Sequence, residues 1–189
     1  VLAVSRVDRR SRDSRTVYLT GRFDGSSFTA DTQSPLPVDC GHDFYAPQVW
    51  FDDEGLAEMP RWIGWLNNWA YADRTAGSGW NGILSIPRTL SLRRVGGELR
   101  LVQLPAAELE AYVGAAVSPE RSEDGVRFSL SSEQAYLLRG RAEAPRRLTV
   151  RLSCGGDELY SLSVRPGEGR GFLRRGLPFL EACGMDGYG

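Results

Sequence analysis

Lysine is absent from the 189-residue chain, and all 23 basic residues are arginine. Isoleucine and asparagine are also scarce, and together these biases indicate the coding preference of a GC-rich genome rather than a choice of arginine for bidentate anion binding. The formal net charge is −1. No overall basic field therefore points to nucleic acid or an acidic membrane as a partner.

Histidine and cysteine are nearly as rare. His42 is the only histidine, and the three cysteines (Cys40, Cys154 and Cys183) lie far apart and form no C-x-x-C motif. This pattern argues against a zinc site, and we expect no metal and no cofactor. The spacing leaves open whether two of the cysteines form a disulfide. No run of about 18 apolar residues exists, so no transmembrane helix is expected.

Short strand-like runs separated by turns fill residues 1–104. Residues 89–93 alternate polar and apolar side chains, and the Gly pair 96–97 separates them from residues 99–102, which predicts a β-hairpin. The acidic run 52–55 ends in glycine and predicts an exposed turn. Further strand candidates, each a short apolar or aromatic run, are residues 44–51, 61–65 and 82–86.

A short helix is predicted over residues 105–113, where a proline stands in the first turn and Gly114 follows the last. Four alternating runs beyond it are spaced as in a β-sandwich, namely 126–130, 135–138, 148–152 and 159–164. Residues 166–189 hold seven glycines and show no convincing strand. We therefore predict an all-β chain in three parts: 1–104, a helical linker at 105–114, and a sandwich at 115–189 with a partly irregular tail.

All five tryptophans lie between Cys40 and Trp80, interleaved with amides and carboxylates. Aromatic rings stack on the apolar faces of sugars while amides and carboxylates hydrogen-bond to hydroxyls, so this composition is typical of a carbohydrate site. Large aromatic residues are more often part of a core. Because strand alternation cannot put both Trp62 and Trp65 on one face, some of the rings must be structural.

Five short motifs follow one another along the first half of the chain: YLTGRFDG (18–25), GHDFYAPQ (41–48), IGWLNNWAYA (63–72), WNG (80–82) and SIPRTLSL (85–92). They resemble, in the same order, motifs of glycoside hydrolase family 32, the invertases, levanases and inulinases. The resemblance covers roughly residues 1–105. Its N-N-W-x-Y form is closer to exo-acting levanases and inulinases than to intracellular sucrose hydrolases.

The resemblance implies a five-bladed β-propeller followed by a β-sandwich, and retaining hydrolysis by an Asp nucleophile and a Glu general acid. The family's Trp-Met-Asn-Asp-Pro, Arg-Asp-Pro and Glu-Cys-Pro motifs, which supply the nucleophile, a sugar contact and the acid, have no match here. Residues 1–5 resemble the strand just after the last of them. We therefore expect the C-terminal portion of a β-fructosidase, with both catalytic carboxylates upstream and no hydrolysis by this chain alone.

Candidate sugar-binding residues also come from the resemblance. Trp69 matches the family's tryptophan at the rim of the fructosyl pocket, and Asp43 and Tyr45 take supporting places near its floor. Asp39 and Asp73 are carboxylate candidates by residue type only. The implied substrates are fructans or sucrose, and nothing in the chain indicates nucleic acid, a membrane or a particular oligomeric state as a further partner.

Three functions are consistent with these observations. The first is the C-terminal portion of an enzyme that cleaves terminal β-fructofuranosyl units from fructans or sucrose. The second is a non-catalytic fructan-binding module that keeps the aromatic residues, and the third is an inactive fragment with unpaired sheet edges. The levanase-like motif predicts a secreted parent enzyme, although residues 1–5 show no signal-peptide pattern.

Overall fold

The computed structural model describes residues 1–51, 59–75, 79–123, 125–131, 133–139, 146–168 and 170–175. Its elements are β-strands and two short 3₁₀-helices, which confirms the all-β prediction. No helix in these ranges is long and apolar enough to cross a membrane. The predicted turn at 52–55 and residues 176–189 of the predicted irregular tail lie outside the described residues.

The first sheet is antiparallel and contains, in spatial order, β1 (Leu2–Val7), β2 (Ser14–Leu19) and β5 (Leu36–Pro37). Asp8 closes the turn between β1 and β2, because its Oδ1 accepts hydrogen bonds from the backbone N–H groups of Arg10 (3.0 Å) and Ser11 (2.7 Å). Such an Asx turn suits a tight connection. A separate hairpin of β3 (Gly21–Phe23) and β4 (Phe28–Ala30) follows β2.

The second sheet is also antiparallel, in the order β10 (Glu98–Pro105), β9 (Arg88–Val95), β7 (Arg61–Leu66) and β6 (Tyr45–Trp50), with β8 (Ile83–Leu84) paired to β7. Strands β9 and β10 form the predicted hairpin. Gly96 and Gly97 adopt φ values of 59° and 87° at its turn, the positive values that a two-residue hairpin loop requires and glycine supplies. The strand candidates at residues 44–51, 61–65 and 82–86 are confirmed as β6, β7 and β8, the last with only two residues.

A core joins these two sheets and contains Tyr18, Val38, Phe44, Trp62 and Leu90. A hydrogen bond from Thr16 Oγ1 of β2 to the Phe44 carbonyl oxygen (3.1 Å) crosses between them. Trp62 is only 3% exposed, so the core interpretation is correct for this tryptophan. Trp65 lies on the opposite face of β7, as strand alternation requires, and is not part of this core.

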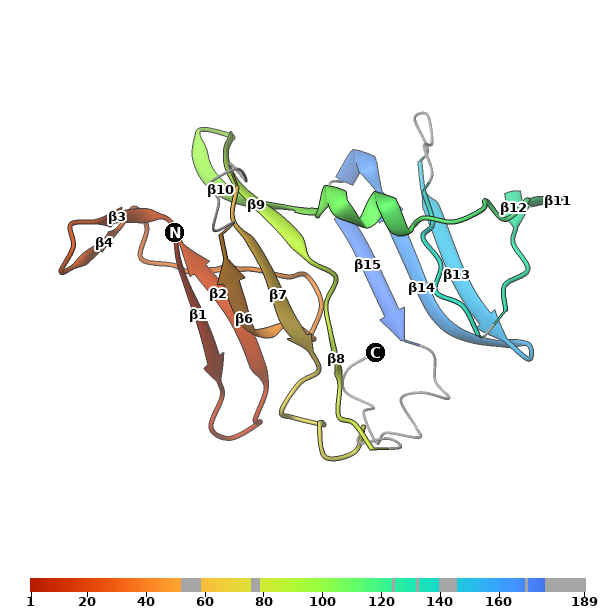
Figure 1. The fold of residues 1–189 in the computed structure, drawn as a ribbon, viewed down its shortest axis with the longest axis horizontal. Coiled ribbons are helices and arrows are strands. Elements are labelled where there is room, and N and C mark those ends of the chain that lie inside the picture. Colours follow the sequence, from red (N-terminus) through yellow and green to blue (C-terminus); the bar gives the residue numbers. More distant parts are fainter. Residues whose placement is uncertain are drawn as a thin grey trace.

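The helix predicted over residues 105–113 is η1 (Ala107–Tyr112), a short 3₁₀-helix. Beyond it lie the short pair β11 (Glu120–Ser122) and β12 (Gly125–Arg127) and an antiparallel sheet of β13 (Leu148–Cys154), β14 (Asp157–Arg165) and β15 (Arg170–Arg175), with the 3₁₀-helix η2 (Pro166–Glu168) before β15. Figure 1 shows this last sheet at the end of the molecule opposite the N-terminal sheets, with β15 as its nearest strand to them.

The predicted strands of the second half have mixed outcomes. Residues 148–152 and 159–164 are strands, whereas 126–130 is a strand only in its first two residues and 135–138 forms none. The prediction that no strand follows residue 165 is wrong for β15, which pairs along β14 from Arg170 to Arg175. The strand was missed because the prediction rested on the glycine content of the whole tail. β15 itself contains only one glycine among its six residues.

Candidate functional site

Three aromatic side chains form a row beside the second sheet. Tyr45 of β6 pairs in register with Trp65 of β7, and their ring centroids lie 6.5 Å apart at 71°. The Trp65 ring lies 5.0 Å from that of Trp69, so both contacts fall in the favourable range for aromatic pairs. Trp69 is 40% exposed, and this aromatic row (Tyr45, Trp65 and Trp69) therefore ends in a ring that a ligand can reach.

A bulge in β6 sets the direction of Tyr45. The register with β7 shifts between Tyr45 and Gln48, and Ala46 adopts a φ of 48°, a left-handed conformation that costs about 1 kcal/mol for a residue with a β-carbon. The Ala46 backbone N–H donates to Ser5 Oγ at 3.0 Å, which holds the bulge against β1. Bulges and strained backbone of this kind are concentrated near functional sites.

The WNG motif fixes the middle of the aromatic row. Trp65 Nε1 donates to the Asn81 carbonyl oxygen at 3.0 Å. Gly82 follows with a φ of 75° and lies so close that a β-carbon there would be 2.2 Å from Trp65 Nε1. Glycine is therefore required at this position both for its backbone conformation and for the space beneath the indole ring.

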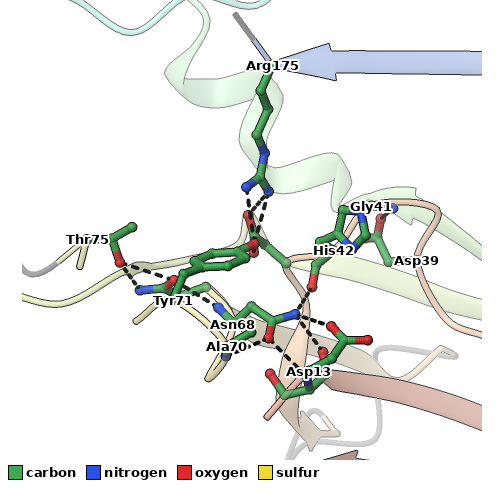
Figure 2. Close-up of polar contacts among 12 residues, drawn as sticks. Asp13, Asp39, Gly41, His42, Asn68, Ala70, Tyr71, Thr75 and Arg175 are labelled. Atoms are coloured by element: carbon green, nitrogen blue, oxygen red, sulfur yellow. Dashed lines mark hydrogen bonds and ion pairs between the residues drawn. The ribbon is translucent and has the colours of Figure 1, made fainter. Parts of the chain in front are cut away.

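Asn68 anchors the turn that carries Trp69, and Figure 2 shows its side chain in contact with Asp13. Its side chain is fully buried, and its Oδ1 accepts hydrogen bonds from the backbone N–H groups of Ser14 and Ala70, each at 3.0 Å. Its Nδ2 lies within hydrogen-bond distance of three oxygens, namely Asp13 Oδ1 (2.8 Å), Ser14 O (3.1 Å) and His42 O (3.0 Å). The Trp69 backbone N–H also donates to Ser14 Oγ at 3.1 Å, so β2 holds the turn at both residues.

Asp43 is bound by two protein groups. Tyr71 Oη donates to Asp43 Oδ1, and Arg175 Nη2 pairs with Asp43 Oδ2. Both terminal nitrogens of Arg175 also lie 3.2 Å from Tyr71 Oη, and Figure 2 shows the guanidinium reaching Tyr71 from the end of β15. Burial, and then the hydrogen bond to Asp43, raise the pKa of Tyr71 far above its ordinary value, so this phenol stays a hydrogen-bond donor.

The other two aspartates considered as carboxylate candidates are held by arginines. Arg88 Nη1 lies 2.7 Å from Asp39 Oδ2, and its guanidinium lies 4.3 Å from the centre of the Phe44 ring in a cation–π contact. Asp73 is a surface residue whose Oδ2 pairs with Arg12 at 2.9 Å. Among the described residues, no group of three His, Cys, Asp or Glu side chains is arranged to hold a metal ion.

Sequence comparison connects this arrangement to a family. A sequence model described as "Glycosyl hydrolases family 32 N-terminal domain" matches residues 1–105, which include both sheets and the whole aromatic row. The chain belongs to glycosyl hydrolase family 32.

Curated relatives of this family 32 chain include a levanase and an extracellular exo-inulinase. It is 31% identical over 155 residues to a levanase of Bacillus subtilis (strain 168), a match that covers 80% of this chain and 22% of that protein. It is 36% identical over 99 residues to an extracellular exo-inulinase of Aspergillus awamori, covering 49% of this chain and 18% of that protein. The chain thus spans about a fifth of the length of these relatives.

Solved family 32 structures share the fold. A fructofuranosidase from Schwanniomyces occidentalis complexed with fructose superposes with a TM-score of 0.60 at 18% identity, covering 95% of this chain and 40% of that one. A family 32 β-fructofuranosidase from Bombyx mori gives a TM-score of 0.59 at 20% identity, covering 88% of this chain and 34% of that one. The predicted membership and its β-propeller class are therefore confirmed, while the blade number and the sandwich stay predictions.

The three candidate sugar-binding residues lie in one region of this family 32 chain. Tyr45 and Trp69 stand at the two ends of the aromatic row, and Asp43 lies two residues before Tyr45, in contact with Tyr71 and Arg175. Sequence reasoning missed Arg175, because it comes 132 residues after Asp43 in a tail for which no strand was predicted. No local motif marks it, and only the pairing of β15 with β14 brings it to the site.

Proposed function

We propose that this chain supplies part of the fructosyl-binding wall of a β-fructosidase that cleaves terminal β-fructofuranosyl units from fructans or sucrose. The observation that carries the proposal is the aromatic row, which ends in the accessible ring of Trp69 on a turn held by the buried Asn68 side chain. A rigid, accessible indole is suited to stacking on the apolar face of a sugar ring. The names of the relatives, levanase and exo-inulinase, support fructans as the substrate class.

Each candidate residue then has a separate role. Trp69 packs on the sugar at the rim, Trp65 and Tyr45 support it from behind, and Asp43 stabilises the pocket floor through its bonds to Tyr71 and Arg175. Residues 1–104 would form propeller blades, 105–114 the linker and 115–189 a sandwich domain. The extracellular relative supports a secreted parent enzyme.

Hydrolysis itself is assigned to the whole enzyme rather than to this chain. Retaining glycosidases need a carboxylate nucleophile and a separate carboxylic acid flanking the glycosidic bond. The three aspartates considered as carboxylate candidates each pair with an arginine: Asp39 with Arg88, Asp43 with Arg175, and Asp73 with Arg12. Because the family motifs that supply the nucleophile and the acid have no match in this sequence, we expect the isolated chain to bind fructan without releasing fructose.

The test is a titration of the purified chain with inulin and levan by isothermal calorimetry, together with an assay for released fructose. Trp69→Ala removes the stacking ring, which we expect to cost about 1–2 kcal/mol, or a roughly 5- to 30-fold higher Kd. Trp50→Ala is the matched control, because Trp50 is 39% exposed, almost equal to Trp69, but lies at the far end of β6 from Tyr45.

The outcomes separate the candidate functions. Binding that Trp69→Ala weakens and Trp50→Ala preserves supports the fructosyl wall. Equal binding by both variants contradicts it, and absence of binding by the unaltered chain favours an inactive fragment. Fructose release by the unaltered chain would overturn the assignment of hydrolysis to the whole enzyme.

A further inference from the structure

Arg175 is the last described residue of β15, yet its side chain belongs to the aromatic site. Only 11% of that side chain is exposed, although β15 is an outer strand of the C-terminal sheet. Its guanidinium contacts Asp43 and Tyr71, which precede it by 132 and 104 residues, and it lies 5.4 Å from the centre of the Tyr71 ring. The C-terminal sheet thus reaches the N-terminal site through a partly buried cation.

The two residues that Arg175 binds flank the ends of the aromatic row. Asp43 stands two residues before Tyr45, and Tyr71 stands two residues after Trp69. The Tyr71 backbone N–H donates to the Asn68 carbonyl oxygen at 3.1 Å, so Tyr71 belongs to the same turn as Trp69. One guanidinium therefore ties together the two segments whose relative position sets the spacing of the row.

The chemistry of these contacts suits positioning more than stabilisation. A partly buried ion pair costs desolvation free energy and is weak support for stability. The planar guanidinium fork, however, donates in fixed directions to two acceptors at once. Here the acceptors are Asp43 Oδ2 and Tyr71 Oη, while Tyr71 Oη donates in turn to Asp43 Oδ1. This closed triangle, the Arg175 clamp (Arg175, Asp43 and Tyr71), fixes orientation as well as distance.

We propose that Arg175 is a positioning residue for the aromatic row, so that the C-terminal sheet helps to set the sugar contact made by Trp69. The expected effect of Arg175 on fructan binding rests on the proposed function. The expected effect of Arg175 on the geometry of the aromatic row does not. Arg175 contacts no sugar in this scheme and acts through Tyr71 and Asp43.

The experiment uses the full chain labelled with 5-fluorotryptophan, whose fluorine resonances report each indole separately. Trp69→Phe assigns the Trp69 signal, and the buried Trp62 signal reports an intact core. The test variants are Arg175→Met, which removes the cation, and Arg175→Lys, which keeps the charge without the planar fork. Arg174→Met is the matched control, because the neighbouring Arg174 lies on the opposite face of β15, in a hollow with Ser161 and Ser163.

We expect Arg175→Met and Arg175→Lys to shift or broaden the Trp69 and Trp65 resonances while the Trp62 resonance stays in place. The Kd for inulin should rise about three- to tenfold in both variants and stay unchanged in Arg174→Met. Arg175→Lys keeps the positive charge, so resonances that still differ from those of the unaltered chain indicate a directional clamp rather than a simple charge pair.

The opposite results are equally clear. Unchanged Trp69 and Trp65 resonances in Arg175→Met overturn the proposal, whatever the measured Kd for inulin. If the unaltered chain binds no inulin, the proposed function fails while the fluorine spectra still decide the clamp. If Arg175→Met also loses the Trp62 signal, the core is disturbed and the Tyr71→Phe variant is used instead, because it removes the shared hydroxyl and keeps the ring. Unchanged Trp69 and Trp65 resonances in Tyr71→Phe also overturn the proposal.

Discussion

Replacing Asn68 by alanine removes the hydrogen-bonding centre of the turn that carries Trp69. The side chain is fully buried, so water cannot take over the bonds that it makes. Its Oδ1 satisfies the backbone N–H groups of Ser14 and Ala70, and its Nδ2 faces three oxygens of the surrounding segments. The substitution therefore leaves the buried Ser14 N–H of β2 and the partly buried Ala70 N–H of the turn without their acceptor.

The expected cost follows from those groups. Each buried N–H that loses its acceptor costs about 1–2 kcal/mol, and the oxygens that lose a donor add a smaller penalty. We expect Asn68→Ala to lower the free energy of unfolding by about 3–5 kcal/mol, a large share of the total for a domain. Asn68→Asp should cost a similar amount, because it keeps the acceptor but buries a carboxylate beside that of Asp13.

Urea unfolding followed by tryptophan fluorescence measures this cost. Asn81→Ala is the control: Asn81 is an exposed amide of the same region whose Oδ1 accepts one hydrogen bond, from Asn67 Nδ2 at 2.7 Å, and its loss should cost about 1 kcal/mol. If Asn68→Ala costs no more than Asn81→Ala, the turn is not held by Asn68 and the rigid placement of Trp69 has to be abandoned.

Two further predictions concern the sheets. Gly64→Ala should lower the free energy of unfolding by about 1–3 kcal/mol, because a β-carbon would lie 2.8 Å from the Phe44 ring; urea unfolding no different from that of the unaltered chain would contradict this packing. The pKa of Asp24 should be lower than its ordinary 3.8, because its carboxylate accepts hydrogen bonds from the backbone N–H groups of Ser27 and Ser26. Since the folded-state pKa is the lower one, this stabilisation of the β3–β4 hairpin is present above pH 3.8 and is lost as the pH falls through the folded-state value. A carboxyl ¹³C titration by NMR measures it, and a midpoint at or above 3.8 would refute it.

Alternation and turn chemistry made the N-terminal half predictable. Residues 89–93 alternate with period two and end at a glycine pair, and both signals are local, so the β9–β10 hairpin follows from them. The same reasoning put Trp62 and Trp65 on opposite faces but could not say which was buried. That choice depends on the first sheet, whose residue Tyr18 completes the core around Trp62.

The C-terminal half was less predictable because its local signals conflict with its pairing. Residues 135–138 carry apolar side chains but form no strand, whereas β15 lies in a glycine-rich tail and pairs along its full length with β14. Strand pairing is a non-local property that propensity captures poorly. The role of Arg175 could not be predicted for the same reason, because no motif near it indicates its ion pair with Asp43 or its contact with Tyr71.

The polar residues around the aromatic row have an internal use that composition could not disclose. Asn67 Nδ2 lies 2.9 Å from Thr75 Oγ1 and 2.7 Å from Asn81 Oδ1, Asn68 binds backbone groups, and Asp43 binds Tyr71 and Arg175. The sequence suggested that these amides and carboxylates would bind sugar hydroxyls. Because protein groups already bind them, we propose that their contribution to recognition is to hold the rings in place, and that the accessible indole of Trp69 is the contact with the sugar.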